Sequence, residues 1–354
     1  MTRLEQVAGA ALMALFLDDI FMTVLYARAG TGLLAPRWNR MVWAALDGVS
    51  RLFGRRRGAV LSYAGPLIVI LLILFWALGL VVGAALIVQP ALGTAITPSS
   101  GDTPKDFVTA LLVAGNSLPI VGGGSYSPHT GGTRLLYLLN SLIGGAVLSL
   151  VLSYLVQVYS GLRERNTLAL TVELMTGGTG DAAEMLARLA PEGDFSDATS
   201  ELGNLVRPLA QTKEGHHFHP LLFYFRFREP IYAVSRFCFV LLDLTTLIET
   251  SLDRDRHGAF IRSGPVGSLR QCALMLLETL DGNFPTADEV SPAGGTCEGS
   301  YAAAVATLRR AGIEPRPDAA GYAEQRRQWE PLVRRVAPTL GYRMEEIDRR
   351  PPSP

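Results

Sequence analysis

The sequence predicts an all-α membrane protein that also carries a helical domain outside the membrane. Hydrophobic residues make up 49% of the chain, charged residues only 18%, and the mean hydropathy is +0.25. A soluble chain of this size is usually about one quarter charged. The charges are also unevenly placed, because residues 58–101 contain none while the region after residue 160 is rich in Arg, Asp and Glu. Two environments therefore share one chain.

Three stretches are predicted to span the bilayer, whose hydrocarbon core of roughly 30 Å requires about 20 helical residues. Residues 59–89 contain no charged side chain, and residues 134–162 contain none after Arg134. Residues 7–27 form a third candidate, apolar except for Asp18 and Asp19. Carboxylates inside a membrane are costly and tend to face protein or water. An amphipathic helix or a signal sequence remains the alternative for this first stretch.

The distribution of basic residues predicts that the amino terminus lies outside and the carboxyl terminus in the cytoplasm. The linker at 31–58 is rich in arginine with Asp47 as its one acid, whereas the loop at 90–133 has the single lysine Lys105 and two aspartates. Short loops rich in Lys and Arg stay on the cytoplasmic side. Arg163 and Arg165 then follow the last span. We expect a multi-pass protein of the bacterial inner membrane.

The loop between the second and third spans contains a helix too short to cross. Residues 104–118 are apolar, with Pro104 and Asp106 in the first turn, where a proline and an acid are favoured. Pro119 disfavours a helical conformation at Leu118, so the helix should stop there. The glycines at 122–124 then allow successive carbonyls to point toward one axis. Non-helical backbone lies at membrane depth only where protein buries it or where it lines a water-filled path.

The order of these segments over residues 59–162 resembles the two-transmembrane, pore-loop potassium channels of prokaryotes. The resemblance implies an outer helix, a pore helix, a filter and an inner helix, with four copies in a ring. The family's filter is T-V-G-Y-G-D, and the matching residues here are Ile120, Val121, Gly122, Gly123, Gly124 and Ser125. The carbonyls of residues 120–124 would bind the permeating K⁺ or Na⁺. The departures at Ile120 and Gly123 favour a poorly selective cation pore.

Two adjacent glycines, Gly144 and Gly145, lie in the inner span about 20 residues after the filter. Mid-helix glycine costs about 1 kcal/mol relative to alanine, so a pair suggests a specific role. Channels of the resembling family often carry a hinge glycine here, while close helix packing is the other interpretation. Polar residues recur below the pair at helical spacing and could face a wet pore: Ser149, Ser153, Gln157 and Ser160.

The chain from residue 163 to 340 is long enough to form a helical cytoplasmic domain with its own core. Helices are expected at 164–176, 181–190, 195–213, 230–252, 266–281, 300–312 and 319–337. The apolar stretch at 230–252 could be a fourth span, but Arg236 and Asp243 lie on one helical face and favour a place in the domain. Residues 283–299 and the tail at 341–354 are predicted to be loop or disorder.

Three motifs of this domain invite a chemical role, and for each a structural one competes. The histidines of "HHFH", at 216, 217 and 219, could bind a metal, but a polar turn is favoured. The "GGTGDAAE" stretch at 177–184 places glycines before a helix, but no apolar strand precedes it, so an ordinary turn capped by Asp181 is favoured. The aromatic and basic stretch at 223–230 could contact nucleic acid or lipid headgroups, or pack as a linker.

These observations predict an ion channel that conducts potassium or monovalent cations through a homotetrameric pore. No catalytic or zinc constellation stands out, so we expect neither an enzyme nor a metal centre, and no cofactor or nucleic-acid partner. The expected organisation is an amino-terminal helix (1–30), a basic linker (31–58), the pore domain (59–162), the helical domain (163–340) and the tail. The alternative is a non-conducting, membrane-anchored signalling or scaffold protein with a degenerate pore loop.

Overall fold

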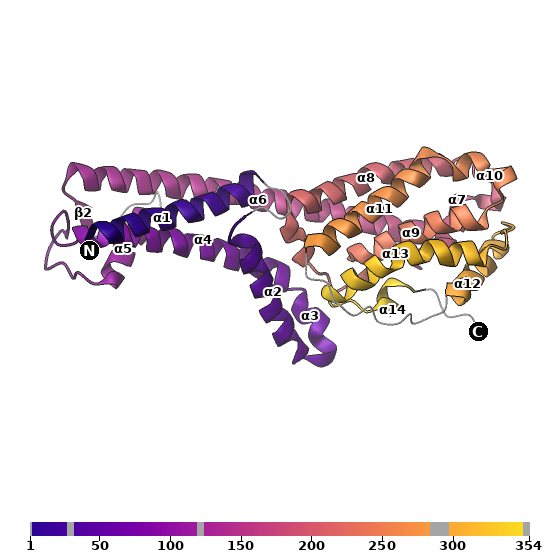
Figure 1. Ribbon diagram of the computed structural model, residues 1–354, viewed down its shortest axis with the longest axis horizontal. Helices are drawn as coiled ribbons and strands as arrows, with labels where there is room; N and C mark the ends of the chain where they lie inside the picture. The colour runs from indigo at the N-terminus through magenta and orange to yellow at the C-terminus, as the bar shows by residue number, and fades with distance from the viewer. Residues whose placement is uncertain (1, 27–31, 119–123, 284–296, 350–354) are drawn as a thin grey trace. The chain divides into compact units, whose positions relative to one another are not determined.

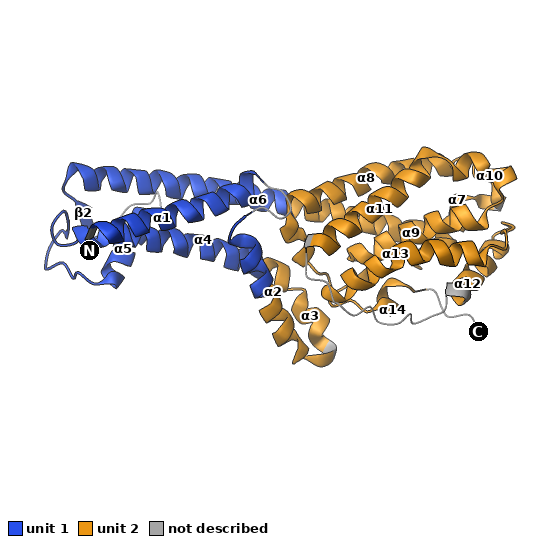
Figure 2. Cartoon of the chain, viewed as in Figure 1, with its two compact units in different colours: residues 1–42, 67–158 blue, residues 43–66, 159–354 orange. Residues whose placement is uncertain are grey.

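The computed structural model of the chain describes residues 2–26, 32–118, 124–283 and 297–349, and most of these residues are helical (Figure 1). The chain forms two compact units (Figure 2). Unit 1 consists of residues 1–42 and 67–158, and unit 2 of residues 43–66 and 159–354. The basic linker expected at 31–58 is therefore divided between the two units.

Unit 1 holds the long apolar helices together with the short helix between them. In chain order its elements are α1 (Thr2–Ile20), a π-helical turn (Phe21–Leu25), the start of α2 (Ala35–Arg51), most of α4 (Ala64–Val88), β1 (Ile96–Pro98), α5 (Phe107–Ser117), β2 (Tyr126–Pro128) and the first part of α6 (Gly131–Met175). Among the described residues, three stretches are long and apolar enough to cross a membrane: Arg3–Leu25, Arg57–Ala91 and Gly131–Met175. Each of the three predicted spans lies on one of them.

Glycines bring α1 and α4 into close contact, and the two helices run side by side (Figure 1). Gly79 and Gly83 are one turn apart on α4. A Cβ on Gly83 would lie 2.6 Å from Cγ of Met13 and 2.9 Å from the carbonyl oxygen of Gly9, and a Cβ on Gly79 would overlap the ring of Phe16. Small residues allow membrane helices to approach closely enough for van der Waals contact. The pair therefore fixes where α1 packs on α4.

Asp19, near the end of α1, is fully buried and connects three helices. Its carboxylate accepts hydrogen bonds from the backbone amides of Leu34 (2.7 Å) and Ala35 (3.1 Å) at the start of α2, and from the indole of Trp76 on α4 (2.8 Å). The first amides of a helix lack partners within it, so an acid from elsewhere in the chain serves as the cap. Asp19 thus faces protein, as expected for a membrane carboxylate, whereas Asp18 is exposed.

Unit 2 is a helical domain built around α9 (Val234–Ser251), in which every residue except Glu249 is buried. A helix buried on all faces belongs to the centre of a domain. The remaining helices of the unit are α3 (Arg57–Leu61), α7 (Ala182–Leu189), α8 (Ala198–Phe218), α10 (Arg254–Ile261), α11 (Gly264–Asn283), α12 (Cys297–Arg310), α13 (Ala319–Thr339) and α14 (Met344–Ile347). The second part of α6 and the rest of α2 also belong to it.

The polar side chains of α9 bond to partners inside unit 2. Arg236 pairs with Glu173 at 2.7 Å, and Asp243 accepts a 2.6 Å hydrogen bond from the hydroxyl of Tyr322. Buried charges require such partners. These bonds agree with the prediction that α9 belongs to the helical domain.

Most helices of this domain were predicted within a few residues, and the differences have physical causes. The polar turn expected at the histidines is wrong, because α8 runs on to Phe218. His216 continues the buried stripe of Leu202, Leu205, Leu209 and Thr212, whose spacing keeps one face of α8 inside the core. The turn at 176–181 is capped as predicted, since Asp181 accepts from the amide of Ala183 at 2.9 Å. Helices α2, α3 and α10 were not predicted, and α14 lies in the tail at 341–354, which was expected to be loop or disorder.

Replacing Gly83 with leucine should separate α1 from α4, because no space exists for a side chain at that position. We expect Gly83→Leu to lower the thermal midpoint of the detergent-solubilised chain, corresponding to about 1–3 kcal/mol of overpacking. Gly48→Leu is the matched control, since an added Cβ at Gly48 would meet no atom within 4 Å. Equal midpoints for the two variants would contradict the packing described for α1 and α4.

Neutralising Asp19 should destabilise unit 1, whereas neutralising its neighbour should not. Asn in place of Asp19 keeps one oxygen but directs an NH₂ group at backbone donors, and hydrogen bonds to a charged group contribute about 1.5–3 kcal/mol each. We therefore expect Asp19→Asn to lower the midpoint of thermal unfolding well below that of Asp18→Asn. Size-exclusion fluorescence after heating measures both. A similar loss in the two variants would show that the Asp19 cap contributes little.

Candidate functional site

The candidate site begins at α5, whose first turn is fixed by Asp106. The side chain of Asp106 accepts from the backbone amide of Thr109 (2.8 Å) and from its hydroxyl (3.0 Å), and these bonds lower the pKa of the Asp106 carboxyl. Acids at this position satisfy amides that lack partners in the helix. The acid was expected in the first turn, and it is the residue that immediately precedes the helix.

The carboxyl end of α5 packs directly on α6. A Cβ on Gly144 would overlap the carbonyl oxygen of Leu118, so only glycine allows this approach. Beside it, the buried amide of Asn140 donates a 3.0 Å hydrogen bond to the hydroxyl of Ser117. The contact at Gly144 provides the packing role that was one of its two predicted roles. The hinge role remains a prediction.

The end of α5 also departs from the expectation based on Pro119. Leu118 keeps helical angles (φ −77°, ψ −43°), and its amide donates to the carbonyl of Ala114 at 3.2 Å. Proline disfavours this conformation in the preceding residue without forbidding it. The packing of the Leu118 carbonyl on Gly144 gives a reason for the exception. The helix itself ends at Ser117, one residue before its predicted end.

Of the five predicted filter residues, only Gly124 lies within the described part of the chain. Ile120, Val121, Gly122 and Gly123 lie outside it. Gly124 is half-buried beside Asn116 of α5, whose side-chain nitrogen would lie 2.9 Å from a Cβ added to the glycine. Gly124 therefore lies in contact with α5.

A two-stranded antiparallel sheet, formed by β1 and β2, holds the chain that follows Gly124. Strand β2 pairs antiparallel with β1, with Thr97 opposite Ser127. The pairing extends at both ends, because the amide of Ser99 donates to Ser125 at 3.1 Å and that of His129 donates to Ala95 at 2.9 Å. The loop leading out of α4 and the segment leading into α6 are thus tied together. Neither strand was predicted, because three-residue strands leave almost no alternating pattern to detect.

The face of α6 below Gly144 carries the predicted polar stripe. Ser149, Ser153 and Gln157 are exposed, and Ser160 is half-buried. The hydroxyl of Ser149 donates to the carbonyl of Gly145 at 3.0 Å, an internal bond of the helix. The chain itself therefore leaves this stripe uncovered.

In unit 2, the segment between α8 and α9 binds the second part of α6. Arg165 of α6 is buried and donates to the carbonyls of Leu222 (2.9 Å) and Phe225 (3.0 Å). His216 is buried nearby, and its burial together with the Arg165 charge lowers the pKa of His216 to about 3, so the ring is neutral at pH 7. The aromatic segment predicted at 223–230 is accordingly buried as a packed linker through Arg226.

The same segment also binds the residues that precede α4. Arg226 donates to the carbonyls of Leu340 (2.9 Å) and Gly58 (2.5 Å), and its guanidinium lies 4.5 Å from the ring centre of Tyr342. A Cβ on Gly65, in the first turn of α4, would lie 2.7 Å from the Phe225 ring. Residues 220–227 are therefore in contact with the start of α4, with α6 and with the end of α13.

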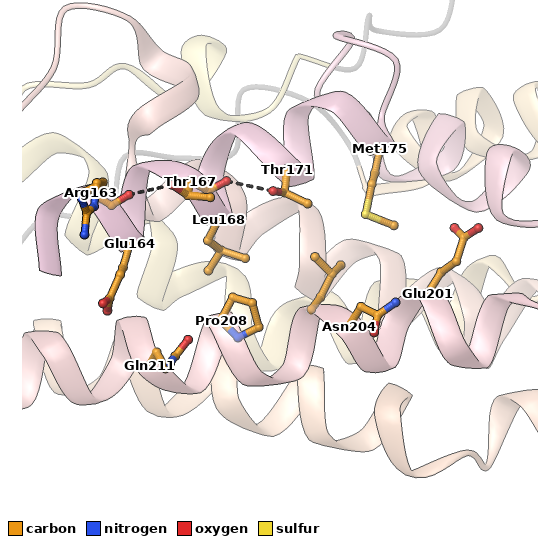
Figure 3. Close-up of a pocket in the computed structure, with 11 residues that line it drawn as sticks. Arg163, Glu164, Thr167, Leu168, Thr171, Met175, Glu201, Asn204, Pro208 and Gln211 are labelled. Atoms are coloured by element: carbon orange, nitrogen blue, oxygen red, sulfur yellow. Dashed lines mark hydrogen bonds between the residues drawn. The ribbon is translucent and has the colours of Figure 1, made fainter. Parts of the chain in front are cut away.

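A groove of about 500 Å³ lies between the second part of α6 and α8 (Figure 3). Figure 3 shows Thr167, Leu168 and Thr171 of α6 facing Asn204 and Pro208 of α8. Glu164 lies near one end of the groove and Glu201 near the other. Its lining combines apolar, hydroxyl and amide groups. No group of three or more metal-ligating side chains occurs among the described residues of the chain.

Several of these positioning residues were not predicted. Asn140, Arg165 and Arg226 act through partners far away in sequence, since Arg226 and Gly58 are 168 residues apart. A polar residue inside a predicted span is the one signal that could have identified Asn140. Nothing local distinguishes Arg226 from the exposed Arg228 two residues later.

The three apolar helices and the comparison with known proteins define an α-helical membrane protein. The chain is 24% identical over 226 residues to "Uncharacterized membrane protein YdjJ" of Bacillus subtilis (strain 168). The match covers 62% of this chain and 62% of the Bacillus protein, which is less than two thirds of its length. No family model matches the chain. No solved structure matches it either.

Adding one methyl group at Gly144 should disturb the end of α5, whereas the same change at Gly115 inside α5 should not. If packing dominates, Gly144→Ala lowers the thermal midpoint of the chain, because the Leu118 carbonyl must move. Gly115→Ala is the matched control and should be neutral or stabilising, since a Cβ on Gly115 would meet no atom within 4 Å and alanine favours a helix by about 1 kcal/mol. Thermal unfolding of both variants in the same detergent provides the comparison. A stabilised Gly144→Ala variant would contradict the close contact with Leu118.

Proposed function

We propose that the chain forms a homotetrameric channel in the cell membrane that conducts potassium or other monovalent cations. Residues 120–124 supply the backbone carbonyls that replace the water around the ion. The amino terminus lies outside and the helical domain in the cytoplasm, as the arginine distribution predicts. The pore carries no cofactor, and its partners are the bilayer, the ion and three further copies of the chain.

The observation that carries this proposal is the docking of α5 on α6. A helix of 11 residues is too short to cross a bilayer, and its carboxyl end packs against Gly144 inside a candidate span. The chain must then return from that contact to β2 through residues 119–125. Backbone at such a depth has to be buried in protein or line water. The carboxyl end of α5 also carries partial negative charge, which favours a cation nearby.

The uncovered face of α6 supports assembly around a wet path. In the most apolar stretch of α6 only 11% of the residues are buried. The corresponding share for the candidate span that includes α4 is 44%. Lipid could cover the leucines of that face, but Ser149, Ser153 and Gln157 are exposed on it too. Polar side chains within a span usually face protein or water. One chain contributes a single filter segment, so a closed ring requires several copies.

A non-conducting scaffold is the second candidate, favoured by the residues at two filter positions. Ile120 lacks the hydroxyl that the resembling family has at this position, and Gly123 lacks the aromatic side chain. In this case α5 would serve only to pack α6, and the helical domain would perform the function. The two candidates differ in one measurable property, the passage of ions.

The test is ion flux through the purified full-length chain in liposomes. We expect a potassium or sodium gradient to drive a flux that protein-free liposomes do not show. Ile120→Thr combined with Gly123→Tyr should raise the preference for potassium over sodium, measured as reversal potentials in a planar bilayer. Ile120→Val with Gly123→Tyr is the matched control, because valine has the shape of threonine without its hydroxyl.

Two results would overturn the proposal. One is a folded, reconstituted protein that passes no ions, and the other is a monomer in both detergent and lipid. Unchanged permeability ratios in the threonine and tyrosine variant would instead contradict the alignment of the filter at residues 120–124.

A further inference from the structure

The turn between α2 and α3, residues 49–57, exposes apolar side chains. Leu52 is 84% exposed, more than any other large apolar side chain in the described part of the chain. Val49 and Phe53 are 50% and 51% exposed. Single exposed apolar residues are common on protein surfaces, but three within five residues at the tip of a hairpin form a patch. We call residues 49–57, which include the end of α2 and the first residue of α3, the α2–α3 turn.

The α2–α3 turn is also strongly basic. Residues 48–63 contain Arg51, Arg55, Arg56 and Arg57 and no acid. The nearest acid, Asp47, binds Arg51 and Arg57 at 2.7 Å each. Partial burial raises the pKa of the Asp47 carboxyl, but the bonds from Arg57 and Arg51 outweigh it and leave this pKa below its ordinary value. The single acid is thus already paired, and the side chain of Arg56 remains exposed.

The rest of this hairpin is held firmly by unit 2. The Trp43 ring lies 5.5 Å from that of Tyr224, and the carbonyl of Gly58 accepts from Arg226 at 2.5 Å. Leu61 is completely buried, and its Cδ1 would lie 2.7 Å from a Cβ added to Gly341. The exposed tip therefore belongs to an ordered hairpin whose other side already has its partners.

Chain connectivity keeps this hairpin close to the bilayer. Helix α2 begins at Ala35, ten residues after the first candidate span ends at Leu25, and α4 begins at Ala64, three residues after α3 ends. Both ends of the hairpin are thus joined to membrane spans on the same side. An apolar tip flanked by arginines is the chemistry that binds the interface of a membrane with anionic lipids.

We propose that the α2–α3 turn is a membrane anchor selective for anionic phospholipids. Leu52, Phe53 and Val49 enter the boundary between headgroups and acyl chains, while Arg51 and Arg56 contact lipid phosphates. The anchor holds the segment that connects α1 to α4 against the cytoplasmic leaflet. This role does not depend on ion conduction and applies equally to a channel and to a scaffold.

The experiment places a fluorophore at the tip of the full-length chain. Leu52→Cys is made in a Cys272→Ser and Cys297→Ser background, leaving the buried Cys238 in place, and is labelled with an environment-sensitive dye. The protein is reconstituted into nanodiscs of phosphatidylcholine alone or mixed with phosphatidylglycerol, each with lipids that carry a nitroxide on the acyl chain. We expect strong quenching in the anionic discs. Arg327→Cys, exposed on α13, is the label control and should not be quenched.

Charge variants separate lipid binding from simple proximity. Arg51→Gln with Arg56→Gln should reduce quenching in the anionic discs to the level seen in neutral discs, since each arginine contributes roughly fivefold near an anionic surface. Arg51→Lys with Arg56→Lys keeps the charges and should retain the quenching. High salt should act like the glutamines, because it screens exposed charges.

Three outcomes would overturn the proposal. The first is the absence of quenching in both the neutral and the anionic nanodiscs. The second is equal quenching in the two kinds of nanodisc that Arg51→Gln with Arg56→Gln does not change. The third is quenching of the Arg327→Cys control label as strong as that of the Leu52→Cys label, which would mean that the signal does not come from the α2–α3 turn. Because none of these readouts measures ion flux, a failed anchor and a failed pore are distinguished.

Discussion

The contact between the Leu118 carbonyl and Gly144 is the constraint on which the position of α5 in unit 1 depends. A helix as short as α5 is only marginally stable alone, so packing must hold it. Its amino end is capped by Asp106, and its carboxyl end is fixed on α6 by Gly144 and by the bond from Asn140 to Ser117. Both ends of α5 are therefore held by contacts within unit 1.

Two buried polar side chains of unit 1, Asp19 and Asn140, bond to partners that are distant in the sequence. Asp19 caps α2 and also binds the indole of Trp76, which lies 57 residues away. In an apolar surrounding an unpaired carboxylate would be very costly, so the bonds of Asp19 determine where the start of α2 lies against α1 and α4. The glycines of α4 act in the complementary way, by removing side-chain volume where α1 approaches. The bonds of Asp19 thus fix α1, α2 and α4, and close packing at the glycines fixes two of them, α1 and α4.

The sequence predicted those parts of the fold whose signal is local. The apolar stretches of α4 and α6 are long enough to be recognised alone, and α5 was recognisable from Pro104 and Asp106. Helix α2 was missed because the arginines of the linker were used only to predict the topology, although apolar and charged residues alternate there at the helical period. His216 was assigned to a turn because its residue type outweighed its position on the buried stripe of α8. The partners of Asp19, Arg165 and Arg226 could not be predicted, since no local pattern specifies a contact between distant residues.

Under the proposed function, the architecture of the pore and its ion selectivity depend on different residues. Ion coordination by main-chain carbonyls needs residues that permit the right backbone angles, and Gly122 and Gly124 retain this property in the sequence. The side chains at Ile120 and Gly123 would instead act on the innermost site and on the wall of the filter. A chain can therefore keep the support of a pore, which rests on α5 and α6, while the side chains that sharpen selectivity change. For this reason the docking of α5 carries more weight for conduction than the identity of any single filter residue.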